Sequence, residues 1–175
     1  MTAQDLTMTS LTEDFRTSLR LCAASISLVT ACDETGGWHG MAVTSSGSLS
    51  MEPPSMMVAI NHTASIHPVI LRTGRFALNL MGEDRLDLLE RFSRSDMRDQ
   101  RFVPGEWTDA VGGVPALKDA LSTHICSVVE RHDFGTHTVF FGAVEDVILP
   151  RTDQATAPIL WLNGARASVA TPLTD

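Results

Sequence analysis

Three hydroxyl side chains follow one another within residues 39–47. They are Thr44, Ser45 and Ser46, and they come directly after an apolar segment that predicts a strand. Hydroxyls and backbone amides at a strand end can hydrogen-bond an anion or a polar ring without added cations. The same pattern suits a solvated strand end, so this stretch alone leaves both interpretations open.

Three other polar positions could contribute to the same kind of site. Residues 61–65 include four hydrogen-bonding side chains and lead into a short helix near Pro68, and helix N-termini favour phosphate. Asn79 lies in an otherwise apolar strand, so its amide needs a partner, either a ligand edge or neighbouring backbone. His137 follows a turn, where it could contact a ligand ring or donate a proton. A plain polar loop and a half-exposed turn histidine are the alternatives.

Other catalytic patterns are not found in the sequence. The six histidines lack metal-ligand spacing, and Glu145 and Asp146 are strand neighbours that must point to opposite faces. No phosphate-binding loop or dinucleotide glycine fingerprint is present, and the serines lack the context of a hydrolase elbow. The sequence therefore predicts no metal site and no catalytic dyad or triad.

Composition restricts the class of protein. The chain has 175 residues and a formal net charge of −8, which argues against binding nucleic acid or an anionic membrane surface. It has no apolar run long enough to span a bilayer and no signal-peptide pattern. Three cysteines without a C-x-x-C pair indicate neither a disulfide framework nor a zinc site. We expect one globular domain in the reducing cytoplasm.

The elements that must position these residues are mostly strands. A capping box at residues 10–13 predicts a helix over 11–23, and residues 1–10 are expected to form a loose leader. The polar, charged residues 93–113 predict a mobile surface excursion. The domain is expected over 11–170, with a tail at 171–175. Strands are expected at 26–32, 38–43, 55–60, 75–80, 122–132, 138–149 and 158–162, and short helices at 67–73 and 83–92. Helices that act only as connectors indicate an antiparallel barrel.

In their order along the chain, these segments resemble the short-chain flavin reductase family, FMN-binding split barrels that serve two-component monooxygenases. The similarity covers about residues 11–165. The matching text is Phe15-Arg16, Val29-Thr30, H-G-M-A-V-T-S-S at 39–46, S-L-S-M-E-P-P at 48–54, N-H-T-A-S-I-H at 61–67, G-R-F-A-L-N-L at 74–80 and H-T-V-F-F-G-A-V at 137–144.

The resemblance implies a mainly β fold, namely a six-stranded antiparallel split β-barrel of Greek-key type with short connecting helices. It implies a homodimer that binds FMN or FAD and takes a hydride from NADH or NADPH. The reduced flavin would diffuse to a separate oxygenase component. Such chemistry belongs to the cofactors, so few acid–base groups are needed.

The resemblance also assigns residues. His137 would contact the nicotinamide nucleotide, and Arg94 is a candidate for the flavin phosphate. The other flavin contacts would be Met41, Ala42, Thr44, Ser45, Ser46, Ile60, Asn61, Ser65, Ile66, Phe76, Ala77 and Asn79.

Three positions depart from the family pattern and leave other functions open. Thr136 stands where Asp is frequent, Gly47 stands where many members have Phe, and residues 161–166 differ from the usual ending. One alternative is an FMN-bound reductase of another acceptor, such as a cobalt corrin, on the same fold. The other is a flavin-binding protein without turnover.

Overall fold

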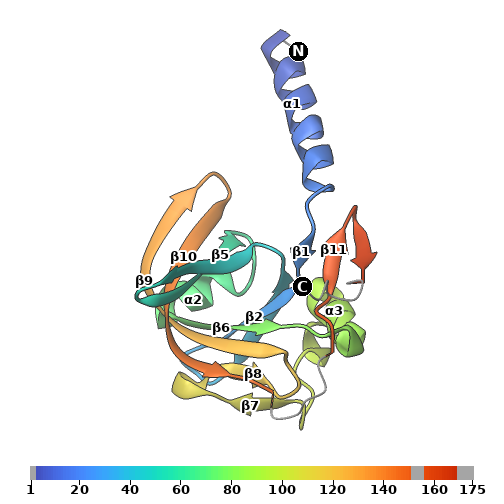
Figure 1. Ribbon diagram of the computed structural model, residues 1–175. Helices are drawn as coiled ribbons and strands as arrows, with labels where there is room; N and C mark the ends of the chain where they lie inside the picture. The colour runs from blue at the N-terminus through green and yellow to red at the C-terminus, as the bar shows by residue number, and fades with distance from the viewer. Residues whose placement is uncertain (1–2, 151–155, 169–175) are drawn as a thin grey trace.

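A seven-stranded antiparallel sheet forms the body of the computed structural model, which describes residues 3–150 and 156–168 (Figure 1). In spatial order its strands are β3 (Trp38–Val43), β2 (Ser27–Cys32), β6 (Arg75–Leu80), β9 (Ser122–Phe134), β10 (His137–Ile148), β5 (Pro54–Asn61) and β4 (Ser46–Met51). No pairing joins the edge strands β3 and β4 within the described residues, so the barrel is split there. The predicted mainly β split barrel is confirmed.

Six of the seven strands expected from the sequence lie in this sheet, and β4, which was not expected, is its seventh member. The strand expected at 158–162 lies outside this sheet. The sequence of β4, S-G-S-L-S-M, consists mostly of residues with little preference for strands. Pairing with β5, from Ser46 opposite Val58 to Met51 opposite Pro54, supplies the order that local propensity does not.

Two small sheets flank the body. One contains β1 (Ala24–Ser25), β11 (Leu160–Leu162) and β12 (Ala165–Ala167), and the other contains β7 (Trp107–Asp109) and β8 (Pro115–Leu117). The second lies partly inside residues 93–113, which are mostly exposed, as predicted for a surface excursion, but which contain regular structure. Arg101 and Trp107 are only 7% and 5% exposed, so this polar segment is anchored by a few buried side chains.

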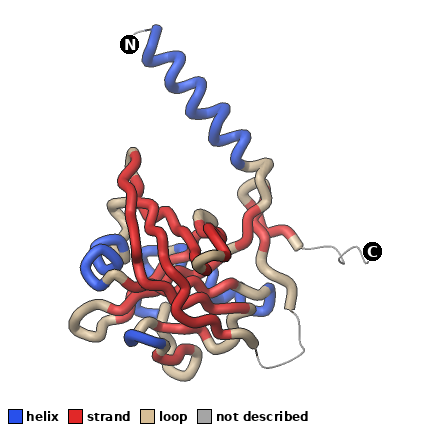
Figure 2. Tube along the Cα trace, turned by 60° about the vertical axis from the view of Figure 1, so that its left-hand side comes forward, coloured by secondary structure: helices blue, strands red, loops and turns tan. Residues whose placement is uncertain are grey.

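Helix α1 (Ala3–Leu19) begins eight residues before the predicted helix and projects away from the barrel (Figures 1 and 2). Ser10, the expected cap, therefore lies inside the helix. The predicted tail at 171–175 lies outside the described residues. No described helix is long and apolar enough to cross a membrane.

The shorter helices cover the sheet where the sequence predicts them. Helix α2 (His67–Thr73) follows β5 and ends at Gly74, whose left-handed φ of 66° suits glycine. Short 3₁₀ turns, η1 (Glu83–Arg85) and η2 (Ser95–Gln100), flank α3 (Leu86–Ser93), and a third, η3 (Val111–Gly113), precedes β8. Gly40 lets α3 approach β3, because a Cβ there would lie 2.7 Å from a ring carbon of Phe92.

Two main apolar clusters hold these layers together. The first fills the barrel between the sheet and α2, and includes Val29, Val58, Ile70, Phe76 and Phe140. The second lies between the sheet, α3 and β7, and its buried members include Leu28, Met81, Leu88, Phe92 and Trp107. Strand β3 contributes to both clusters because successive side chains point to opposite faces. This places the end of β3 at the junction of barrel and helix α3.

Candidate functional site

The three predicted hydroxyl residues lie where β3 passes into β4: Thr44 and Ser45 form the link, Ser46 begins β4, and the link is held against β5. The hydroxyl of Ser45 donates to the carbonyl oxygen of Ala59 at 2.7 Å, and the Ala59 N–H donates to the carbonyl oxygen of Ser45 at 3.1 Å. Thr44 and Ser45 are exposed and Ser46 is half-buried. The link is therefore a fixed surface with accessible hydroxyls.

The structure brings residues 61–65 together with His137. Strands β5 and β10 pair so that Asn61 lies directly opposite His137. The N–H of His62 donates to the carbonyl oxygen of Thr136 at 3.0 Å. The side-chain oxygen of Asn61 accepts the N–H of Thr63 at 2.9 Å, which shapes the loop. Two segments more than 70 residues apart in the chain thus meet at one barrel end.

A chain of hydrogen-bonded side chains lies next to His137, starting at its neighbour Thr138. The hydroxyl of Thr138 donates to Asp133 Oδ1 at 2.5 Å, and it lies 2.8 Å from His67 Nε2. Because the Thr138 hydrogen is used on Asp133, His67 Nε2–H must be the donor to Thr138. Burial lowers the pKa of His67, with the nearby His62 acting in the same direction. The hydrogen bond from Thr138 lowers the pKa of Asp133. We term these three residues the His67 network.

Two hollows lie along β3. One, of about 220 Å³, is bordered by Ala42, Val43 and Thr44. The rest of its wall comes from the link between β1 and β2, from α3 and from β11, namely Ile26, Leu89, Ser93 and Trp161. The other, of about 240 Å³, lies at the start of β3 and includes Ser65 and Arg98 in its wall. One elongated ligand could therefore contact both hollows along the free edge of β3.

Arg101 anchors the segment that carries Arg98. Its guanidinium donates to three backbone carbonyl oxygens, those of Gly40 at 2.7 Å, Arg91 at 3.0 Å and Arg94 at 2.8 Å. It also lies over the ring of Phe92, 5.7 Å from the centroid. Burial lowers its pKa. Sequence reasoning missed Arg98 and Arg101, and their place in a charged stretch gave no signal to separate them from other surface arginines.

Arg94 is occupied by carboxylates in this structure. Its guanidinium contacts Glu90 at 3.1 Å and Asp96 at 2.7 Å, and the hydrogen bonds that it donates to Asp96 and then to Glu90 raise its pKa. It does not border either hollow. The arginines at the hollow that includes Ser65 are instead Arg98 and Arg101.

Several other residues assigned by resemblance have almost no surface. Ile60 and Ile66 are each 1% exposed, and Phe76, Ala77 and Asn79 are fully buried. Strand β6 lies between β2 and β9, which covers the backbone of residues 76–79 on both sides. These five residues belong to the core of the single chain.

The partners of Asn79 are neighbouring protein groups. Its Nδ2 donates to the Leu28 carbonyl oxygen and to Thr30 Oγ1, both at 3.1 Å. Its Oδ1 accepts from the Leu117 N–H at 2.8 Å and from Thr123 Oγ1 at 3.0 Å. Of the two interpretations left open by the sequence, the structure supports the one without a ligand.

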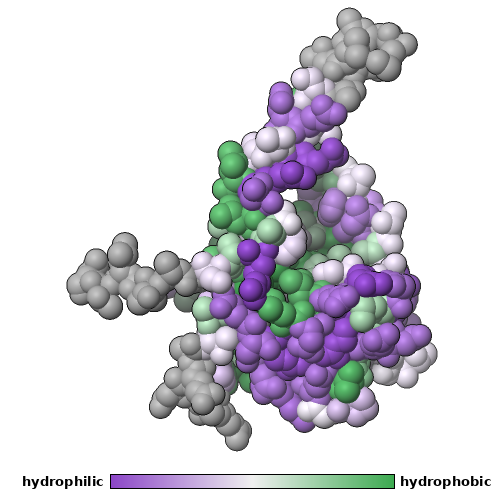
Figure 3. All heavy atoms as spheres, turned by 90° about the vertical axis from the view of Figure 1, so that its right-hand side faces the viewer, coloured by the Kyte–Doolittle hydropathy of each residue, from purple (hydrophilic) through white to green (hydrophobic). Residues whose placement is uncertain are grey.

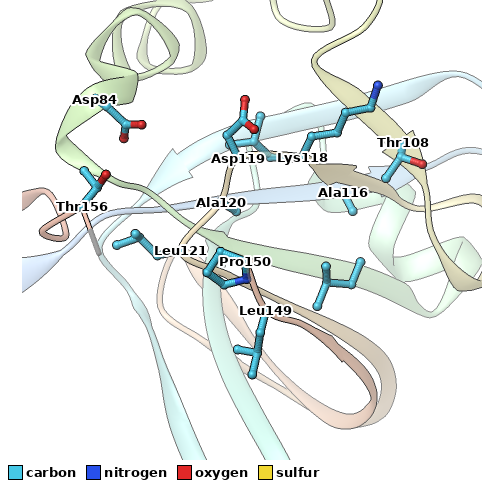
Figure 4. A pocket seen from close by; sticks show the side chains of 12 residues that line it. Asp84, Thr108, Ala116, Lys118, Asp119, Ala120, Leu121, Leu149, Pro150 and Thr156 are labelled. Carbon is cyan, nitrogen blue, oxygen red and sulfur yellow. The ribbon is translucent and has the colours of Figure 1, made fainter. Parts of the chain in front are cut away.

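A larger hollow, of about 670 Å³, lies at the opposite end of β10 and is not part of this site. Ile148 borders it, roughly 35 Å along the strand from His137. Figure 4 shows Asp84 and Asp119 on one side of the hollow and Leu149 and Pro150 on the other. It contains none of the predicted site residues.

Residues 19–170 match the family model of the flavin reductase like domain. The chain belongs to the flavin reductase family.

Relatives agree with this assignment over most of their length. The reductase component of FADH(2)-dependent resorcinol hydroxylase from Rhizobium sp. (strain MTP-10005) is 36% identical over 162 residues, which cover 91% of this chain and 88% of the relative. The FMN reductase (NADH) RutF of Methylorubrum populi is 32% identical over 176 residues, which cover 90% of this chain and 87% of the relative. The solved styrene monooxygenase flavin reductase (SMOB) from Pseudomonas putida S12 superposes with a TM-score of 0.79 at 29% identity, covering 91% of this chain and 99% of that structure.

Proposed function

We propose that this flavin reductase family member transfers a hydride from NADH or NADPH to FMN or FAD and supplies reduced flavin to a separate oxygenase component. The observation that carries the proposal is the convergence of residues 44–46, residues 61–65 and His137 at one barrel end, beside two hollows along β3. The names of the relatives support it, since they include an FMN reductase (NADH) and two reductases associated with oxygenases.

The residues present fit a flavin. Met41, Ala42 and the hydroxyls of Thr44, Ser45 and Ser46 would hold the ring and ribityl chain. Donors there would meet the negative charge that grows on the ring during reduction. Asn61, Ser65 and Arg98 would hold the phosphate end, where a charged donor is required because the net charge of −8 repels anions. Arg98 takes the place that the resemblance gave to Arg94.

The protein's own part in the reaction is alignment. A bound flavin supplies the hydride-accepting chemistry. His137, half-buried opposite Asn61, would pack against the nicotinamide and orient it. Hydride transfer itself moves no separate proton, so we assign His137 no acid–base step.

The proposal includes the assembly and the location. We infer a homodimer, because large apolar side chains such as Phe134 and Met51 are each 80% exposed on the single chain. We infer the cytoplasm from the cysteines, because Cys22, Cys32 and Cys126 are all free. No nucleic-acid or membrane partner is proposed.

Binding of FMN and riboflavin to two arginine variants tests the site. Arg98→Ala should weaken FMN binding about 10-fold or more, because a hydrogen bond to a charged group is worth about 1.5–3 kcal/mol. Riboflavin, which lacks the phosphate, should bind the variant as it binds the wild type. Arg94→Ala is the matched control and should leave both affinities near wild type. The reverse pattern, with Arg94 sensitive and Arg98 not, would place the phosphate elsewhere.

A further inference from the structure

Helix α1 carries an apolar stripe that the rest of the described chain leaves uncovered. Leu11 and Phe15 are each 61% exposed and Leu19 is 52% exposed. They recur every four residues, so they lie on one face of the helix. We term these three residues the helix stripe.

The helix is held away from its own barrel. The Asn163 N–H donates to the Arg20 carbonyl oxygen at 2.7 Å, which fixes the base of α1 beside the small sheet of β1, β11 and β12. From there the helix extends into solvent, and apolar surface lies on one side of its base (Figure 3). Most helical stability in proteins comes from packing of an apolar face, so the apolar face of α1 is suited to a covering partner.

A second uncovered apolar surface lies on the outer face of β4, β5, β9 and β10. It is a groove of about 470 Å³ whose apolar lining includes Leu49, Pro53, Val129 and Phe141. Leu49 and Val129 are 49% and 65% exposed. We term this surface the strand groove.

We propose that the helix stripe of one copy docks in the strand groove of a second copy, and that the exchange is reciprocal. The inference rests on the proposed homodimer and specifies how its two copies hold each other. One chain carries both the projecting helix and the receiving groove, which is the condition for a closed two-fold assembly with two identical contacts.

Both surfaces offer apolar area that a second copy would bury. The stripe residues are 52–61% exposed, and Leu49 and Val129 in the groove are 49% and 65% exposed. A reciprocal exchange buries both surfaces on each copy, and a stable interface buries about 800 Å² on each partner in total.

Charge also favours a second copy as the occupant. Arg16 and Arg20 follow Phe15 and Leu19 in the chain and place positive charge beside the helix stripe. Glu130 lines the groove and Glu52 adjoins it at Pro53. The basic end of the helix therefore matches the acidic rim of the groove, which orients the docking.

Disulfide trapping between two differently labelled copies tests the exchange directly. In a Cys22→Ser background, a Phe15→Cys chain is mixed with a Val129→Cys chain of different tag length and oxidised. We expect a covalent heterodimer that contains one chain of each kind, because Phe15 of one copy meets Val129 of the other. Glu13→Cys, on the opposite helix face, is the matched control and should give little product.

A stripe variant separates this inference from the proposed homodimer. Leu11→Gln/Phe15→Gln/Leu19→Gln should have the 19 kDa mass of a single chain by light scattering where the wild type has twice that mass. If wild type is a dimer but no cross-link forms and the stripe variant stays dimeric, the exchange is refuted and the homodimer stands. If wild type itself has the mass of one chain, both are refuted.

Discussion

Two buried polar networks lie in the same barrel, and they end differently. Asn79 makes four hydrogen bonds to β2, β8, β9 and their connections, and both it and Thr30 are fully buried. The His67 network also starts in the core, at Thr138, but it ends at Asp133, whose side chain is 75% exposed beside His62. One network is closed within the protein and the other reaches the surface at the candidate site.

The difference separates buried polar side chains that only stabilise the fold from those that also connect to an accessible surface. A group whose donors and acceptors are all satisfied inside the fold has nothing left for a ligand, so its contribution is to stability. A network that continues to an accessible edge can instead hold ligand-contacting groups in a fixed position relative to the core. The two networks should therefore respond differently to substitution.

The largest effect should come from Asn79→Leu. This change removes four hydrogen bonds and leaves the Leu117 N–H and the Leu28 carbonyl oxygen buried without that partner. We expect the free energy of unfolding to fall by about 3–5 kcal/mol in denaturant titrations. Ser48→Ala, at an exposed hydroxyl, is the control and should change it by less than about 0.5 kcal/mol. A small effect of Asn79→Leu would mean that the closed network does not hold the strands together.

A smaller loss of stability, joined to a kinetic defect, is expected for Thr138→Val. The variant keeps the side-chain shape but removes the hydroxyl between His67 and Asp133, at a cost of about 1–3 kcal/mol. Because this hydroxyl ties α2 to the β9–β10 hairpin, His137 should lose its alignment. The KM for NADH should rise several-fold while flavin affinity changes little.

Thr123→Val is the matched control for this kinetic effect. It removes a buried hydroxyl from the closed network, where Thr123 donates to Asn79 Oδ1 at 3.0 Å. We expect a comparable loss of stability with normal KM and kcat. Equal kinetic defects in both variants would remove the distinction between the networks.

The smallest expected effect is a pH dependence through His67. Its pKa is lowered in the folded protein, so the folded state binds fewer protons than the unfolded state near the ordinary pKa of about 6.5. The contribution is fully present above that pH and is lost as pH falls toward the folded value, by at most about 1.4 kcal/mol per pH unit. His62, Arg131 and Asp133 face the same group and modulate it.

Unfolding measured between pH 8 and pH 5.5 checks this sign. Wild type should lose stability as the pH falls, and His67→Gln should show a shallower slope over the same range. A wild-type slope that is unchanged in the variant would assign the titration to other groups.

Much of the fold could be predicted from the sequence, because the strands of the barrel carry apolar, β-branched runs between clear turns. β4 could not, since its serines and glycine have little strand preference of their own. Residues 93–113 contain many charges, and only the tertiary structure shows that Arg101 and Trp107 turn inward.

The candidate site was predictable as separate pieces but not as an arrangement. Residues 44–46, residues 61–65 and His137 were each visible as polar positions at strand ends. Their meeting depends on the register that sets Asn61 opposite His137, which only strand pairing determines. Arg94 and Arg98 are indistinguishable in the sequence, and carboxylate partners in the fold separate them.

The central claim is that the barrel end beside His137 holds a flavin and aligns NADH against it. The most direct test is anaerobic addition of NADH to the protein with FMN, followed at the absorbance of oxidised flavin. The account predicts rapid bleaching with stoichiometric NADH oxidation, and His137→Ala should need several-fold more NADH while binding FMN normally. Protein that binds FMN but leaves it oxidised in excess NADH would contradict the account.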